Sequence, residues 1–481
     1  MPLDETSFRT KVLRGFLWVG VGTFMGQLIS WGATILVIRI LLPSDYGLMA
    51  MALTFIALLT TISELGIGAS IIQAEQIKDG EIRQIFGVVV ISIFLGWILS
   101  YIAAPIIALF YNEQRLVPII RIMSINFFLI GLYVVPESLF VREMDFKTKA
   151  KIDISATVGS SLFTLFLAFK GMGVWALILG LIALHATKAV SFNVARSSWF
   201  KPIFNYKGSG RLVRFGVTVT GDRLFYYLYT QLDKIIAGKF LGDNLLGIYA
   251  VALTLASIPM EKVLPIITHV SFASYSRIQD DINRIRRNLL RTIHMISFAS
   301  FPIFLGMAGV APEAIPLILG SKWESIVLPF QLLSLVLPLK ALSNVLPPAI
   351  FATGKPKVNL LNMAITCVIM AIALLIGVNA GLLGICIAWI FAYPIIFLIT
   401  SIRCLRVLGI PFRDFFSEIK FPLFASIFML ISIILLKKIT VSLQSFSCLI
   451  VLIIFGVVFY SGLILVFARD EYLNLKTFLQ R

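Results

Sequence analysis

The sequence predicts an all-α polytopic membrane protein of about fourteen transmembrane helices, built from two six-helix lobes and a C-terminal helix pair. Of its 481 residues, 59% are apolar and 14% are charged, whereas a water-soluble domain has about 25% charged residues. Apolar stretches long enough to span a bilayer follow one another along the whole chain, and one segment recurs 200 residues later. These three observations exclude a water-soluble, disordered or disulfide-stapled protein.

The apolar stretches set the number of spans, because a helix needs about 20 apolar residues to cross roughly 30 Å of hydrocarbon. The first stretch is too long for a signal peptide and lacks a small-x-small cleavage site, so we read it as an uncleaved span. The fifth and thirteenth are the shortest. The predicted spans run at about 15–38, 46–73, 84–110, 116–141, 153–169, 174–195, 215–238, 245–275, 290–310, 325–352, 358–378, 382–402, 421–436 and 446–468.

The distribution of Lys and Arg predicts the orientation in the membrane. With the N terminus in the cytoplasm, cytoplasmic segments carry 27 basic residues, outer loops 7 and spans 7. This asymmetry follows the positive-inside rule and places both termini in the cytoplasm. The net charge of +17 is then explained by topology and by anionic lipid head groups as partners. Nucleic acid is not an expected partner, because the basic residues are scattered rather than gathered on one face.

An internal repeat predicts the arrangement of the helices. Residues 39–54 (RILLPSDYGLMAMALT) align with residues 239–254 (KFLGDNLLGIYAVALT), with six of the sixteen positions identical. Six spans separate equivalent points, so the copies have the same orientation and form a parallel repeat about an axis along the membrane normal. We therefore expect an N-terminal lobe at 1–205, a second lobe at 206–410, and a helix pair with a cytoplasmic tail at 411–481.

The chain contains no motif for catalysis, metal binding or ATP binding. It has no G-x-x-x-x-G-K-[ST], H-E-x-x-H or G-x-S-x-G sequence, and its four cysteines form no C-x-x-C pair. We therefore predict no catalytic residue, no metal and no cofactor, and the chain is expected not to be an enzyme.

The seventh predicted span is too polar to face lipid. Within Gly221–Lys234 (GDRLFYYLYTQLDK), one helix face carries Arg223, Tyr227, Thr230 and Lys234. Gln27 of the first span occupies the position equivalent to Tyr227 in the repeat. Exposing a charge to lipid costs at least about 2.5 to 3.5 kcal/mol, so these faces are expected to line a substrate cavity. The alternative is that the charges of this span form ion pairs that only join helices.

Aromatic and charged residues extend the predicted lining. Tyr226 and Tyr227 lie near mid-membrane, where they suit stacking and hydrogen bonding to a sugar, with core packing as the alternative. The other basic candidates are Arg121 and Lys262 within spans and Arg39 and Lys239 at the outer mouths of the repeats. A positive lining suits an anionic head group such as a pyrophosphate. A coupling proton or sodium ion is the further alternative, at Glu64, Asp222 or Glu261.

These residues resemble the polysaccharide transporter (Wzx-type flippase) family of the multidrug/oligosaccharidyl-lipid/polysaccharide (MOP) exporter superfamily. Singly each motif is weak, but their order and spacing are specific to the family. The similar segments are Arg39–Gly47, Glu64–Gly66 with Gln73, Arg142–Phe146, Gly171–Leu177, Gln231–Lys234, Gly238–Gly242, Leu246–Tyr249, Ser276–Asp281, Gly320–Trp323 and Gly354–Pro356. The family's phenylalanine-proline before the serine-arginine motif reads Phe272-Ala273 here, so its proline kink is not expected.

The resemblance implies a bacterial inner-membrane flippase for undecaprenyl-pyrophosphate-linked oligosaccharide repeat units, working by alternating access in exopolysaccharide, capsule or O-antigen synthesis. It implies a cationic central cavity for the head group, and Arg223 and Lys234 match this pattern best. Polysaccharide polymerase or export proteins are candidate partners. Two alternatives stay open, a drug or small-cation exporter with an acidic lining and a membrane polysaccharide polymerase. A polymerase needs a large outer loop, whereas the longest outer loop here is about 311–324.

Overall fold

The computed structural model describes residues 25–63, 71–72, 77–196, 201–204, 210–277, 281–439 and 445–468, and all regular secondary structure in these ranges is helical. The chain divides into two compact units, Met1–Gly247 and Ile248–Arg481. The boundary between the units falls inside one long helix. The lobe boundaries predicted from the repeat stay a prediction, because the units reflect packing rather than sequence repetition.

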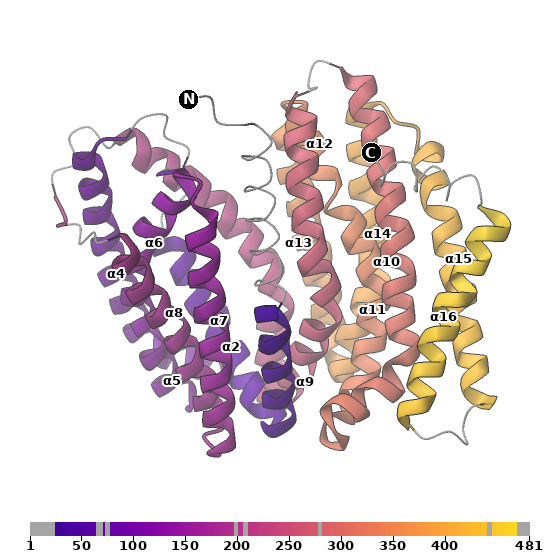
Figure 1. Ribbon diagram of the computed structural model, residues 1–481, viewed down its shortest axis with the longest axis horizontal. Helices are drawn as coiled ribbons and strands as arrows, with labels where there is room; N and C mark the ends of the chain where they lie inside the picture. The colour runs from indigo at the N-terminus through magenta and orange to yellow at the C-terminus, as the bar shows by residue number, and fades with distance from the viewer. Residues whose placement is uncertain are drawn as a thin grey trace, which may run out of the picture. The chain divides into compact units, whose positions relative to one another are not determined.

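The first described helix of the first unit is Met25–Ile40 (Figure 1). Pro43 begins the second helix at the position where proline is tolerated, and Asp45 Oδ2 accepts a hydrogen bond from Leu42 N at 3.0 Å. The helices of this unit are α2 (Pro43–Ser63), α4 (Asp79–Tyr111), α5 (Leu116–Met123), α6 (Ile125–Arg142), α7 (Phe146–Phe169), α8 (Val174–Arg196) and the first part of α9 (Gly210–Arg277). Gly242 interrupts α9 with φ 78° and ψ −177°.

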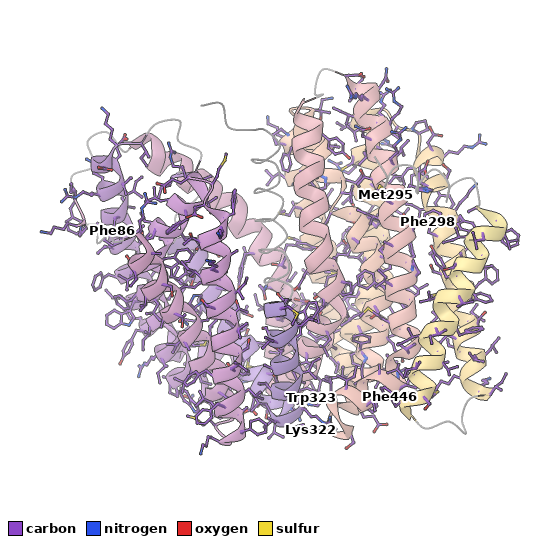
Figure 2. The ribbon with its side chains drawn as sticks, viewed as in Figure 1. Phe86, Met295, Phe298, Lys322, Trp323 and Phe446 are labelled. Atoms are coloured by element: carbon purple, nitrogen blue, oxygen red, sulfur yellow. The ribbon has the colours of Figure 1, made fainter. Side chains whose placement is uncertain are left out.

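The second unit contains the rest of α9 and the remaining helices. They are α10 (Ile282–Leu319), η1 (Ser321–Ile326), α11 (Val327–Ser343), α12 (Leu346–Ala352), α13 (Pro356–Gly377), η2 (Val378–Ala380), α14 (Gly381–Leu408), α15 (Phe412–Ile439) and α16 (Ser445–Phe467). Figure 2 shows Lys322, the buried Trp323 and Phe446 toward one end of this unit, with Met295 and Phe298 nearer the other. Helices α10, α11 and α14 pack side by side (Figure 1).

The prediction of an all-α, multi-span membrane protein is confirmed. Within the described ranges, 11 segments are long and apolar enough to cross a membrane, and one of them, Pro356–Leu408, holds both α13 and α14. Two predicted spans, 153–169 and 421–436, begin later than the helices that contain them. Helix α7 begins at Phe146, and α15 begins at Phe412. The first turns of both helices are charged, and hydropathy therefore did not include them. In α7 the start is fixed by Asp145, whose Oδ1 accepts from Thr148 N at 3.0 Å.

The two copies of the sequence repeat touch within the first unit. A methyl group built on Gly47 would overlap the carbonyl oxygen of Asp243, and one built on Gly247 would overlap the carbonyl oxygen of Pro43. Residues 43 and 243 are equivalent in the repeat, as are residues 47 and 247. The contact is therefore reciprocal, as a two-fold-related pair of segments requires. It depends on the missing side chains, because only glycine allows the two backbones to approach this closely.

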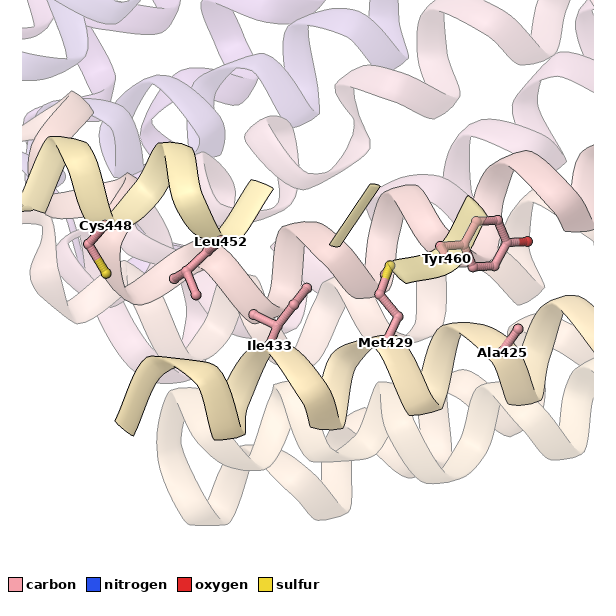
Figure 3. Packing of buried hydrophobic residues seen from close by; sticks show 6 residues of the cluster. All are labelled: Ala425, Met429, Ile433, Cys448, Leu452 and Tyr460. Atoms are coloured by element: carbon pink, nitrogen blue, oxygen red, sulfur yellow. The ribbon is translucent and has the colours of Figure 1, made fainter. Parts of the chain in front are cut away.

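In the second unit, α15 and α16 pack on α10 around a buried cluster (Figure 3). Its members are Ala425, Met429, Ile433, Cys448, Leu452 and Tyr460. A histidine–glutamate contact and a lysine–glutamate ion pair bracket this cluster along α15. His294 Nδ1 lies 2.8 Å from Glu418 Oε2, and Lys437 Nζ lies 2.5 Å from Glu313 Oε1. The C-terminal helices are thus held to α10 by apolar packing between two polar contacts.

We predict that Gly47→Ala and Gly247→Ala each destabilise the protein by at least about 2 kcal/mol, because the added methyl group overlaps a backbone carbonyl that cannot move by side-chain rotation. Thermal unfolding of the purified protein in detergent measures this. Gly159→Ala in α7 is the control, because nothing lies within 4 Å of a methyl group built there. Melting of the Gly47 and Gly247 variants at the control's temperature would contradict the reciprocal contact.

Candidate functional site

The polar face of α9 joins this helix to α2. The Tyr227 hydroxyl donates a hydrogen bond to the Thr54 carbonyl, and Thr230 Oγ1 donates to the Tyr227 carbonyl at 3.0 Å. Both side chains are half-buried. Tyr227 thus links the two repeat-related regions, and Thr230 turns its hydroxyl proton toward its own helix. The oxygen atoms of both hydroxyls keep acceptor capacity for a ligand.

Lys234 lies on the same face, and its charge has no partner among the described residues. Its side chain is half-buried and makes no hydrogen bond or ion pair within the described residues. The neighbouring Asp233 is 4% exposed and accepts a hydrogen bond from Lys234 N at 2.8 Å through Oδ1. The two side chains therefore do not neutralise each other, although they are adjacent in sequence.

The equivalent face of the first span is used partly for packing. Ser30 and Ser161 of α7 share a hydrogen bond of 2.8 Å between their hydroxyls, and Thr34 Oγ1 donates to the Ser30 carbonyl at 2.8 Å. Gln27 is half-buried. Of this face, Gln27 is the side chain that retains both amide donors and an acceptor for a ligand, judged by the described residues.

The other predicted site residues lie in different surroundings. Arg39 is exposed, and Lys239 Nζ donates to the Phe110 carbonyl at 2.5 Å. Glu261 accepts a hydrogen bond from Ser257 Oγ at 2.9 Å. Arg121 stacks on the Tyr101 ring, with 4.3 Å between the guanidinium carbon and the ring centroid. The side chains of Arg223, Tyr226, Asp222, Lys262 and Glu64 lie outside the described residues.

A cluster of charges surrounds the reciprocal glycine contact. Arg115 Nη2 lies 2.6 Å from Glu113 Oε2 and 2.8 Å from Asp243 Oδ2. The hydrogen bond from the Arg115 side chain lowers the pKa of the Glu113 carboxyl below its usual value. Arg115 thereby ties the loop after α4 to the turn of α9 that contacts Gly47.

Sequence reasoning missed a network of charges that joins three helices of the first unit. Lys149 Nζ lies 2.8 Å from Glu137 Oε1 and 2.5 Å from Asp153 Oδ2, and Lys188 Nζ lies 2.7 Å from Asp153 Oδ1. The four charges come from α6, α7 and α8 and balance each other. The spacing of Lys149 and Asp153, four residues apart at a helix start, was the signal that could have pointed to it.

A cavity of about 610 Å³ opens at the ends of α4, α6 and α8 in the first unit. Asp79 and Arg83 lie on α4, and Glu143 faces Arg196 across a double hydrogen bond of 2.6 and 2.9 Å. That hydrogen bonding lowers the pKa of the Glu143 carboxyl. Among the described residues no group of three His, Cys, Asp or Glu side chains is arranged to hold a metal ion.

Comparison with known proteins identifies the family. The profile of a family described as polysaccharide biosynthesis protein matches residues 36–328, which is more than half of the chain. The chain belongs to this family. The resemblance to Wzx-type proteins drawn from the sequence motifs is thereby confirmed.

Relatives of this Wzx-type chain come from several bacteria. It is 26% identical to the lipopolysaccharide biosynthesis protein WzxC of Escherichia coli K12 over 430 residues, covering 88% of this chain and 86% of WzxC. It is 25% identical to the teichuronic acid biosynthesis protein TuaB of Bacillus subtilis 168 over 331 residues, 68% of each. It is also 25% identical to the succinoglycan biosynthesis transport protein ExoT of Rhizobium meliloti 1021 over 294 residues, 59% of this chain and 58% of ExoT.

Solved structures show the fold of the Wzx-type chain. The lipid II flippase MurJ in an inward closed conformation superposes with a TM-score of 0.76 at 16% identity, over 95% of this chain and 100% of MurJ. An inward-facing MATE multidrug transporter of the MOP superfamily superposes with a TM-score of 0.61 at 15% identity, over 80% of this chain and 95% of that protein. The protein is therefore a multi-pass membrane transport protein of bacterial polysaccharide biosynthesis with a MurJ/MATE-like fold.

We predict that Asp153→Asn destabilises the protein by about 2 kcal/mol, because it leaves Lys188 without a counter-charge at a half-buried position. The double variant Asp153→Asn with Lys188→Met should recover most of the loss, since it removes both charges of that pair. Thermal unfolding in detergent measures both. Lys147→Met, an exposed cation on the same helix, is the control and should shift stability by less than about 0.5 kcal/mol. Failure of the double variant to exceed Asp153→Asn would contradict the pairing.

Proposed function

We propose that this protein flips an undecaprenyl-pyrophosphate-linked oligosaccharide repeat unit across the bacterial inner membrane by alternating access. Membership of the polysaccharide biosynthesis family supports this, as do relatives named for lipopolysaccharide and succinoglycan biosynthesis and a MurJ-like fold. The product would serve synthesis of exopolysaccharide, capsule or O-antigen. A polysaccharide polymerase would then act on it at the outer face.

The proposal rests on the ammonium of Lys234 on the polar face of α9, which has no partner in the part of the chain that the structure describes. A charge within a span is costly unless an opposite charge or water meets it. Tyr227 and Thr230 on the same face offer hydroxyl oxygens, which suit a sugar, while the ammonium suits a phosphate oxygen. A cation next to sugar-binding hydroxyls matches both parts of a glycosylated pyrophosphate head group.

The remaining predicted residues take roles in this proposal by position. Arg223 is placed with Lys234 on the head group, and Gln27 with Tyr226 on the sugars. Lys262 adds positive charge within the second copy of the repeat, while Arg39 and Lys239 guide the anion at the outer mouths. Glu64, Asp222 and Glu261 are the candidates for a coupling proton or sodium ion. Fourteen spans in two six-helix lobes and a helix pair, with both termini in the cytoplasm, complete the proposed topology.

We predict that Lys234→Gln lowers polymer export at least about tenfold at unchanged protein level in the membrane, because it removes a charge-assisted hydrogen bond to the head group. Lys234→Arg should retain a substantial part of the activity. Export in a deletion strain complemented with each variant measures this, with membrane abundance determined by immunoblot. The control is Lys170→Gln, an exposed lysine that stacks on Phe166 at the end of α7. Wild-type export from Lys234→Gln would contradict the head-group role.

The deletion strain itself distinguishes the alternatives. A flippase predicts that lipid-linked repeat units accumulate on the cytoplasmic face. Accumulation on the outer face would instead identify a polymerase, and an unchanged pool of repeat units with increased drug sensitivity would identify a drug exporter. Labelling with a membrane-impermeant reagent reports which face the repeat units occupy.

A further inference from the structure

Arg121 is a cation within a candidate span whose charge has no protein partner among the described residues. It lies on α5, inside the apolar segment Leu116–Arg142. Its guanidinium stacks on the Tyr101 ring at 4.3 Å, and its Nε is buried without a hydrogen-bond partner. A guanidinium keeps its charge at any physiological pH, so it cannot escape the cost of the membrane by losing a proton. The charge is therefore available to an anion from outside the described part of the protein.

Carboxylates on the helices that pack against α5 are engaged elsewhere. Asp45 of α2 accepts from Leu42 N, and Glu137 of α6 binds Lys149. Glu81 of α4 caps the opposite end of that helix by accepting from Lys78 N at 2.9 Å. Asp79 also lies at that end, 22 residues and thus about 33 Å before Tyr101 along the helix. None of these carboxylates forms an ion pair with Arg121 in the described part of the chain.

The surface beside Arg121 is apolar and open. Tyr101 is 45% exposed, and Ile98, Ile102 and Ile106 of the same helix are 43%, 61% and 64% exposed. On a helix that belongs to a membrane span, exposed isoleucines at this spacing form a lipid-facing surface. Arg121 thus borders lipid, whereas Lys234 lies on a face with polar neighbours.

The depth of Arg121 and Tyr101 in the membrane brings the guanidinium within reach of the lipid phosphates. The 33 residues of α4 extend about 49 Å, so about 10 Å project at each end when the helix is centred on roughly 30 Å of hydrocarbon. Tyr101 lies ten residues, or about 15 Å, before the end of α4 at Tyr111. Its ring is then about 5 Å inside the hydrocarbon boundary. An arginine side chain at that depth reaches the phosphate level by extending along the surface.

We propose that Arg121 and Tyr101 form a binding site for the phosphate of a phospholipid, in the leaflet at the C-terminal end of α4, which the topology predicts to be the outer one. The terminal guanidinium nitrogens donate to two phosphate oxygens, and the tyrosine ring holds the guanidinium plane. The acyl chains lie along Ile98 and Ile102. The site is separate from the transport path and does not depend on the proposed substrate.

The test is lipid binding by the full-length protein in detergent after removal of endogenous lipid. Phosphatidylglycerol and diacylglycerol with the same acyl chains are the probes, and native mass spectrometry counts bound molecules. The wild type should retain phosphatidylglycerol in preference to diacylglycerol. Arg121→Gln should weaken phosphatidylglycerol binding about tenfold at one site, because it removes charge-assisted hydrogen bonds to the phosphate, and leave diacylglycerol binding unchanged.

Two further variants sharpen the result. Tyr101→Leu replaces an exposed ring by an apolar side chain suited to lipid, so it tests the site even if Arg121→Gln does not fold, and it should also weaken phosphatidylglycerol binding. Arg115→Gln is the matched control, because Arg115 lies beyond the same end of α4 but binds Glu113 and Asp243, and lipid binding should be unchanged. Equal phosphatidylglycerol binding by wild type, Arg121→Gln and Tyr101→Leu would overturn the proposal. Retention of a polyprenyl pyrophosphate but not of phosphatidylglycerol by the wild type would overturn the assignment to phospholipid.

Discussion

The inability of hydrocarbon to solvate charge is the constraint that organises the polar residues of this protein. Four charges satisfy this constraint by neutralising one another across three helices, namely Glu137, Lys149, Asp153 and Lys188. Lys234 and Arg121 have no counter-charge within the described residues, and the surroundings of the two side chains differ. Lys234 shares a face with hydroxyls, whereas Arg121 rests on an aromatic ring beside exposed isoleucines. The same energetic cost therefore separates a structural network from a candidate substrate contact and a proposed lipid contact.

Much of the fold could be predicted from the sequence because the signal is local. Twenty apolar residues define a spanning helix without reference to any neighbour. The signal fails where a helix begins with charged turns, as at Phe146 in α7 and Phe412 in α15, since those turns leave the hydrocarbon. The repeat predicted the relation between residues 43–47 and 243–247. It could not predict that they touch, because a close backbone contact depends on how helices are placed and not on their composition.

The candidate site was less predictable, because pairing across helices depends on three-dimensional register. Asp153 and Lys188 are far apart in sequence, and nothing in the composition of α7 or α8 shows that they meet. Arg121 was placed in the cavity lining by the rule that charges within spans face the interior. That rule does not distinguish a central path from a lipid-facing edge. Helix α5 has no broad polar face from which its orientation could be predicted. For Tyr227, Thr230 and Lys234, helical periodicity predicts a shared polar face of α9, and their role as site residues stays a prediction.

The two polar contacts between α10 and α15 show how a membrane can set the register of two helices. Nineteen residues separate His294 from Glu313, and nineteen separate Glu418 from Lys437. This spacing is about 28 Å along a helix, close to the thickness of the hydrocarbon. The helices therefore run in the same direction, and a bilayer centred between the two pairs would leave each pair near one of its surfaces, where polar groups are tolerated. A slip of α15 by one turn would separate both pairs at once and move Lys437 relative to Glu313, which is only 10% exposed. Apolar packing around Met429 and Ile433 fills the length between the two polar contacts. The polar contacts therefore fix the register, and the apolar residues between them supply the buried surface.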